Sequence, residues 1–68
     1  MIYLKNRFTK TEWWIDLEKV SAISLNWSPA FAGQPGNWMY TIKGPGFTAE
    51  VDSKDLPDQI KLKFGLKS

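Results

Sequence analysis

The sequence contains no cysteine and no histidine. Disulfides are therefore excluded, the usual zinc ligand sets are missing, and nucleophile–base pairs built on Cys or His cannot form. No apolar run reaches the ~20 residues of a membrane helix, and charged residues follow Met1 too closely for a signal peptide. The chain also lacks phosphate-binding and nucleotide-binding motifs. We therefore expect a cytoplasmic protein that is not an enzyme, needs no cofactor or metal and does not enter a membrane.

Short length makes a stable core difficult to build. The 68 residues allow one domain, 1–68, and below roughly 70–80 residues a core rarely supplies more than about 3–5 kcal/mol of net stability. With disulfides and metals excluded, oligomerisation and an aromatic core remain. Aromatic residues make up 15% of the chain, and the net charge of +2 is too small to indicate nucleic acid by itself.

Alternation of apolar and polar residues predicts five half-buried strands, at 2–8, 13–18, 22–27, 38–43 and 47–52. Each predicted inner face carries at least one aromatic residue. We expect the core to contain Ile2, Leu4, Phe8, Trp13, Ile15, Leu17, Ile23, Leu25, Trp27, Trp38, Tyr40, Ile42, Phe47, Ala49 and Val51. The fold class is mainly β, a single small antiparallel β-roll or barrel of five to six strands with at most one short C-terminal helix.

The first hairpin has a testable register. Placing Phe8 opposite Trp13 also places Arg7 opposite Trp14, a cation–π pair, and Lys5 opposite Asp16, an ion pair. Further along, Gly44-Pro45-Gly46 predicts a tight reversal with Pro45 and Gly46 at its centre.

The C-terminal segment carries two signals. Asp55-Leu56-Pro57-Asp58 is typical of a helix start, whereas residues 60–64 alternate as a strand does. We expect one helical turn at 56–59, followed by an edge strand with lysines on one face.

The run Ile15-Asp16-Leu17-Glu18-Lys19-Val20-Ser21-Ala22-Ile23 resembles a bridge found in many short bacterial and phage β-roll proteins. Small flagellar regulatory proteins and a segment of the LytTR DNA-binding domain share that pattern. The resemblance implies a structural corner between two strands and assigns no functional residue.

The most unusual feature is a gap in the charges, because no Asp, Glu, Lys or Arg occurs from Ser21 to Ile42. Inside the gap lies the loop 28–37, whose centre, Phe31, is an aromatic residue in a segment expected at the surface. Phe31 can cover the chain's own core as a lid, or the loop can form an interface. The predicted partner-binding residues are Pro29, Phe31, Gln34, Asn37, Trp38 and Met39.

A second candidate is the outer face of the first hairpin, where basic and aromatic residues interleave as they do on single-stranded nucleic-acid platforms. Its residues are Tyr3, Lys5, Arg7 and Trp14. Cross-strand pairing explains the same residues, and the neighbouring Asp16 and Glu18 would repel phosphates. Two acidic pairs, Asp16 with Glu18 and Glu50 with Asp52, could in principle hold Mg²⁺, although charged outward faces are routine in strands.

The sequence therefore predicts a non-catalytic binding module that acts through protein–protein contact and self-association, most simply as a homodimer. A small bacterial or phage accessory protein, including an inhibitor of a host component, would fit this size. Two alternatives stay open: single-stranded nucleic-acid binding through the Tyr3–Trp14 face, and sequestration of a small molecule between subunits near Phe31 and Trp38.

Overall fold

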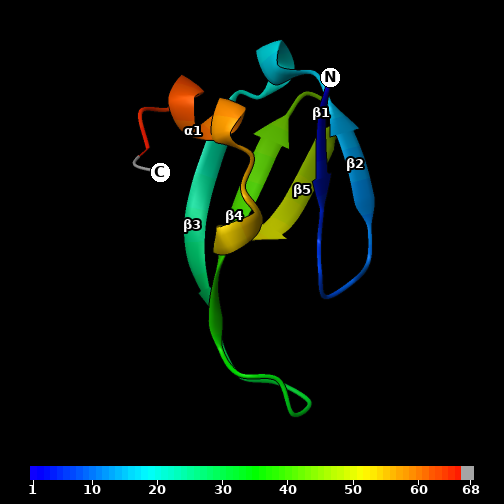
Figure 1. Ribbon diagram of the computed structural model, residues 1–68, viewed down its shortest axis with the longest axis vertical. Coiled ribbons are helices and arrows are strands. Elements are labelled where there is room, and N and C mark those ends of the chain that lie inside the picture. Colours follow the sequence, from blue (N-terminus) through cyan, green and yellow to red (C-terminus); the bar gives the residue numbers. More distant parts are fainter. Residues whose placement is uncertain (67–68) are drawn as a thin grey trace.

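The computed structural model describes residues 1–66 and contains five strands in two antiparallel sheets (Figure 1). Strands β1 (Ile2–Lys5) and β2 (Glu12–Ile15) form the smaller sheet. Strands β3 (Ala22–Ser28), β4 (Asn37–Gly44) and β5 (Phe47–Asp52) form the larger one, in the order β3-β4-β5. The mainly β fold with five strands is confirmed. The closed barrel is wrong, because no strand of one sheet pairs with a strand of the other within residues 1–66.

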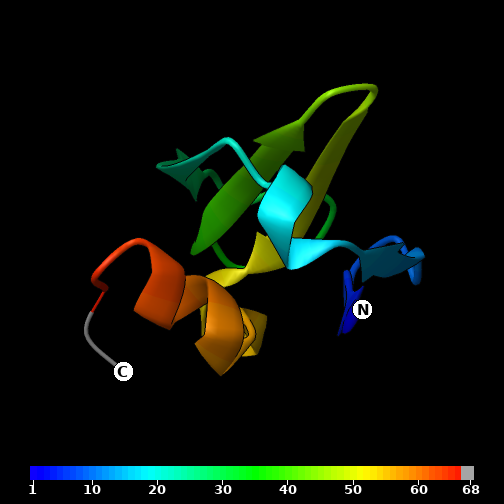
Figure 2. The ribbon, with the colours of Figure 1, turned by 90° about the horizontal axis from the view of Figure 1, so that it is seen from above.

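The chain has two short 3-10 turns, η1 (Leu17–Lys19) and η2 (Ser53–Asp55), and one short helix, α1 (Asp58–Lys63). Seen from above, α1 and the β1–β2 hairpin lie against the same face of the larger sheet, which we call the inner face (Figure 2). The buried core lies between these layers and comprises Ile2, Leu4, Ile15, Val20, Ile42, Ala49, Val51, Leu56 and Ile60. No helix within residues 1–66 is both long and apolar enough to span a bilayer.

The register of the first hairpin differs from the prediction. Leu4, not Phe8, lies opposite Trp13, and Tyr3 lies opposite Trp14. The reason is the turn: the side chain of Asn6 accepts hydrogen bonds from the backbone N–H groups of Phe8 and Thr9, which ends β1 early. The shift spans four residues, so each side chain keeps its face.

The corner implied by the sequence resemblance is present. β2 ends at Ile15, and the carboxylate of Asp16 accepts a hydrogen bond from the N–H of Glu18, which begins η1 between β2 and β3. Lys5 therefore faces Glu12, and the predicted pair with Asp16 is wrong.

The predicted reversal after β4 is confirmed, because Gly44 pairs with Phe47 and Gly46 has a φ of 82°.

The predicted edge strand over 60–64 is wrong, because residues 60–63 belong to α1 and Phe64 is its C-cap. Leu56, Ile60 and Phe64 recur every four residues, the spacing of one helical face. Leu56 and Ile60 are buried and Phe64 packs against the core, whereas Leu62, which a strand would place beside them, is 80% exposed. The helix also starts later than predicted, with Pro57 as its N-cap.

Four residues predicted for the core are substantially exposed. Phe8 lies beyond the end of β1, in the turn. Leu25, Trp27 and Trp38 occupy the predicted face of the larger sheet, since Leu25 pairs with Tyr40 and Trp27 with Trp38. They stay exposed because β3 and β4 extend beyond the part of the sheet that α1 and the β1–β2 hairpin cover (Figure 1).

Candidate protein-binding surface

The segment that joins β3 to β4 is an ordered hairpin that projects from the rest of the molecule (Figure 1). Phe31 and Gln34 exchange backbone hydrogen bonds of 3.1 and 2.9 Å around Ala32 and Gly33. Both central residues have positive φ values, 52° and 81°, as a type I′ hairpin turn requires. We call residues 28–37 the arm. The arm lies entirely inside the stretch that carries no charge.

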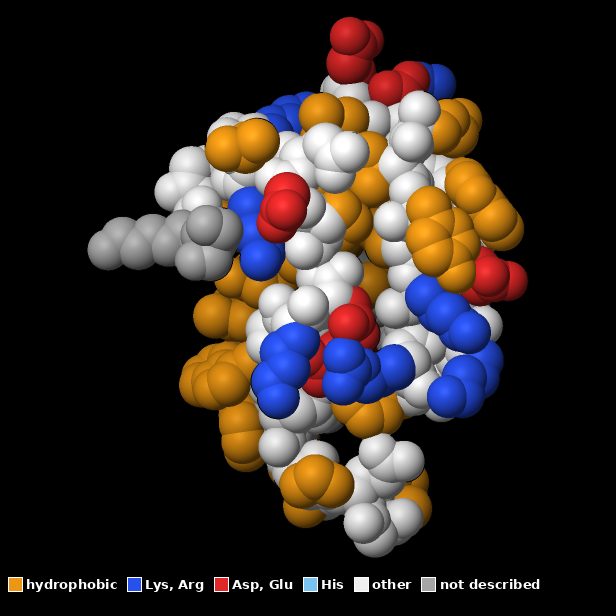
Figure 3. Space-filling model, in the orientation of Figure 1, with side chains coloured by type: hydrophobic (Ala, Val, Ile, Leu, Met, Phe, Trp, Pro, Cys, Tyr) orange, Lys and Arg blue, Asp and Glu red, His pale blue; other side chains and the backbone are white. Residues whose placement is uncertain are grey.

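Three large apolar side chains form what we call the aromatic patch: Leu25, Trp27 and Trp38, each about half exposed. The rings of Trp27 and Trp38 meet edge to face with centroids 5.3 Å apart. Trp27 also lies directly over Gly36, where a β-carbon would collide with its ring. Hydrophobic side chains gather along this edge of the molecule and on the arm (Figure 3). Sequence reasoning missed Leu25 and Trp27 as site residues, because their alternation matches that of a core.

The predicted partner-binding residues divide between the two faces of the sheet. Trp38 belongs to the aromatic patch on the inner face. The other five line a cleft of about 490 Å³, together with residues of the turn after β1 and of β5. The full lining is Asn6, Phe8, Thr9, Ser28, Pro29, Phe31, Ala32, Gln34, Pro35, Asn37, Met39 and Glu50. We call this the outer cleft.

Phe31 does not act as a lid. Its side chain is 82% exposed, and it is not among the residues that pack against the core. The backbone hydrogen bonds of the type I′ turn hold it at the end of the arm, away from the inner face. The lid alternative is therefore wrong for this chain, and the interface alternative is taken up below as a proposal.

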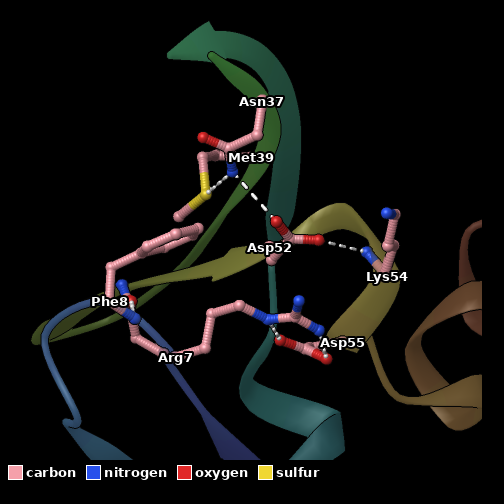
Figure 4. A network of polar contacts seen from close by, with 8 residues as sticks. Arg7, Phe8, Asn37, Met39, Asp52, Lys54 and Asp55 are labelled. Carbon is pink, nitrogen blue, oxygen red and sulfur yellow. Dashed lines mark hydrogen bonds and ion pairs between the residues drawn. The ribbon is translucent and has the colours of Figure 1, made fainter. Parts of the chain in front are cut away.

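The floor of the outer cleft is fixed by a partly buried polar network (Figure 4). Asn37 donates hydrogen bonds from its side-chain amide to Asp52 Oδ2 and to Met39 Sδ, both at 2.9 Å. Asp52 is only 5% exposed, and its other oxygen accepts a 2.8 Å bond from the N–H of Lys54, capping η2. The Asn37 amide is thus engaged within the chain, and it holds the base of the arm to the end of β5.

The alternative nucleic-acid face is only partly assembled. Tyr3, Lys5 and Arg7 line a second cleft of about 410 Å³, with Lys10 and Asp55 beside them. We call it the basic cleft; Lys and Arg side chains cross this part of the surface in Figure 3. Trp14 does not line it and instead packs on Tyr3, with ring centroids 5.3 Å apart.

Arg7 does not contact Trp14 as predicted. Its guanidinium donates two 2.7 Å hydrogen bonds to the carboxylate of Asp55 (Figure 4). These bonds, and then the charge of Arg7, hold the pKa of Asp55 below its ordinary value. The pair leaves Lys5 and Lys10 as the net positive charge of the basic cleft.

In each of the two acidic pairs, the aspartate has a local structural role and the glutamate does not. Asp16 caps η1 and Asp52 caps η2, while Glu18 and Glu50 are exposed. Within the described part of the chain, 1–66, no three acidic side chains come together as a metal site would need.

Comparison of the chain with protein-family models, with curated proteins and with solved structures finds no match.

Proposed function

We propose that this chain is a non-catalytic binding module that acts through protein–protein contact, with a second copy of itself as the first partner. The observation that carries the proposal is the aromatic patch beside the arm. Leu25, Trp27 and Trp38 expose large apolar side chains next to one another, and the arm adds Phe31. Exposed apolar patches mark interaction sites, and interface cores are enriched in aromatic residues and depleted in charge.

The charge distribution favours a second copy over a charged partner. The patch and the arm carry no charge, so a strongly acidic or basic molecule would gain no electrostatic attraction there. Two copies, each with a net charge of +2, can approach through this neutral surface with little repulsion. Association would also supply the buried apolar area that a chain of this length has difficulty supplying alone.

The experiment measures solution mass against concentration by multi-angle light scattering and sedimentation velocity. The parent chain should move from 7.8 kDa towards twice that mass as its concentration rises through the micromolar range. Trp27→Lys and Phe31→Lys should both stay at the monomer mass, because a lysine charge desolvated in an apolar contact is costly. Phe31 is so exposed that its substitution should leave the circular dichroism spectrum unchanged.

Trp14→Lys is the matched control. Trp14 is 62% exposed against 54% for Trp27, and each indole packs on one aromatic ring at a centroid distance of 5.3 Å. The control should associate as the parent does. A parent chain that remains at 7.8 kDa up to millimolar concentration would overturn self-association. Loss of association in the control, but not in Trp27→Lys or Phe31→Lys, would place the interface on the β1–β2 hairpin instead.

A second candidate function is weak binding of single-stranded nucleic acid at the basic cleft. The observation in its favour is that Lys5 and Lys10 lie in one cleft beside the ring of Tyr3. Binding there would weaken steeply as salt rises, because phosphate contacts release counterions. Fluorescence anisotropy with a labelled oligonucleotide tests it: a Lys5→Glu, Lys10→Glu variant should lose any binding. Binding that the double variant retains would exclude this cleft.

A further inference from the structure

β3 presents an open edge. It is the outer strand of the larger sheet, it pairs only with β4, and within residues 1–66 nothing pairs with its other side. It is also the most exposed strand, with no buried residue along its length. Figure 1 shows β3 at the margin of the sheet opposite the β1–β2 hairpin.

This edge carries none of the usual sequence protection. Natural edge strands are kept apart by charged side chains, especially Lys, or by Pro. Between Ala22 and Ser28 there is no charge and no Pro, although the strand is seven residues long. A long, uncharged and exposed edge is a template for pairing with another strand.

The pairing with β4 determines which backbone groups face outwards. Gly44 and Phe47 flank the two-residue turn Pro45-Gly46, and they form the hydrogen-bonded pair that closes it. Hydrogen-bonded and non-hydrogen-bonded pairs alternate along an antiparallel ladder, so the even-numbered residues of β4 direct their N–H and C=O groups to β5 and the odd-numbered ones direct theirs to β3. The partners of those odd-numbered residues are the even-numbered residues of β3, which therefore direct their groups to β4. The odd-numbered residues of β3, Ile23, Leu25 and Trp27, direct theirs to the open edge.

We propose that β3 pairs antiparallel with β3 of a second copy, about a two-fold axis at Leu25, so that the two larger sheets become one. This inference rests on the proposed self-association and specifies its geometry. A two-fold axis at Leu25 lets all seven residues of each strand overlap. It also pairs odd-numbered residues with odd-numbered ones, so the outward backbone groups of both copies meet.

The side chains agree with this register. Leu25 faces Leu25 of the partner copy, and Ile23 faces Trp27 of the partner copy, so the apolar side chains of both strands share the inner face. On the opposite face, Ser24 faces Asn26 of the partner copy, which pairs polar with polar. The strand is thus self-complementary, as a two-fold interface requires.

Cysteine crosslinking tests the register, because the chain has no Cys of its own. Leu25 faces its own copy in a hydrogen-bonded pair, where the α-carbons are ~5.5 Å apart, a separation that a disulfide can span. Leu25→Cys should oxidise to a covalent dimer at least ten times faster than Tyr3→Cys at equal concentration. Tyr3 is the control, since it is 47% exposed against 49% for Leu25.

A mixture tests the same register independently. Ile23→Cys and Trp27→Cys should each crosslink poorly alone and should form a disulfide heterodimer when mixed. If Leu25→Cys and Tyr3→Cys crosslink equally slowly while the parent is a dimer, edge pairing is wrong and self-association stands. If the parent is a monomer throughout, both proposals are overturned.

The backbone contribution is tested by Leu25→Pro. Proline removes an N–H that points to the open edge, and it is tolerated on edge strands because the ladder with β4 is untouched. The variant should retain the circular dichroism spectrum of the parent and lose the dimer. The control is Leu25→Val, which keeps the N–H and an apolar side chain and should still dimerise. A Leu25→Pro variant that folds and dimerises as the parent does would overturn the edge pairing.

Discussion

Arg7 and Asp55 are 48 residues apart in the chain and are joined by two hydrogen bonds of 2.7 Å. Arg7 follows β1 and Asp55 ends η2, so the pair links the smaller sheet to the segment that leaves the larger one. Because the two sheets share no backbone pairing within residues 1–66, this polar contact supplements the apolar core in holding them together.

The first prediction concerns acid stability. The pKa of Asp55 is lowered in the folded chain by its hydrogen bonds from Arg7, so the pair stabilises the fold above the unfolded-state pKa of about 4. This contribution should be lost as pH falls through the lower, folded pKa. Asp55→Asn should therefore reduce the fall in thermal stability between pH 5 and 2, measured by circular dichroism, whereas Asp58→Asn, whose side chain is 83% exposed, should not.

The second prediction concerns Tyr3. Its hydroxyl donates a 2.7 Å hydrogen bond to the carboxylate of Glu12, which raises the pKa of Tyr3 above its ordinary value of 10.0. Glu12→Gln should lower that pKa towards 10.0, because the acceptor loses its charge. Ultraviolet absorbance of the phenolate, titrated in a Tyr40→Phe background, measures the change. Identical titrations with and without Glu12 would show that the hydrogen bond does not form in solution.

The third prediction concerns the buried carboxylate of Asp52. Asp52→Ala removes the cap of η2 and leaves the amide of Asn37 without its oxygen partner. The loss should be about 1–3 kcal/mol of unfolding free energy. Glu50→Ala, two residues earlier on β5 and exposed, should change stability by no more than about 0.5 kcal/mol. Urea denaturation compares the two, and equal losses would contradict the network.

The fourth prediction separates the core from the aromatic patch. Ile42 is fully buried, and Ile42→Ala should cost about 2–5 kcal/mol, as large-to-small core substitutions do. Trp27→Ala should cost only about 1–2 kcal/mol at a concentration where the chain is monomeric, less than the roughly 3–5 kcal/mol of a buried Trp. Denaturation of dilute protein tests this; a larger loss for Trp27 than for Ile42 would mean that Trp27 is a core residue.

Alternation in the sequence predicted the five strands and the centre of the core, since Ile42, Ala49 and Val51 are all fully buried. It could not place the register of the first hairpin, because the observed shift of four residues leaves every side chain on its face. The deciding contact is local and polar: Asn6 binds the backbone of the turn. The turn does not permit the predicted register, in which Arg7 would lie opposite Trp14.

Alternation also identifies a face without saying how much of that face is covered. Leu25 and Trp27 lie on the same side of the sheet as Ile23, yet they lie beyond the reach of α1 and the β1–β2 hairpin. In the C-terminal segment the sequence carried two periods at once, since Ile60 and Phe64 fit both a strand and a helix. The helix is formed because it also brings Leu56 into the core.

Ala32 adopts a left-handed backbone conformation, with a φ of 52°, that disfavours a β-carbon by roughly 1–2 kcal/mol. Folding already includes this energetic cost, and the two backbone hydrogen bonds between Phe31 and Gln34 hold the turn of the arm in the free chain. A mobile loop would lose about 1–2 kcal/mol per ordered residue on contact, whereas the arm loses little of this entropy again. The proposed partner copy would therefore meet a preorganised surface, and variation at Phe31 should alter how long the complex lasts more than how fast it forms.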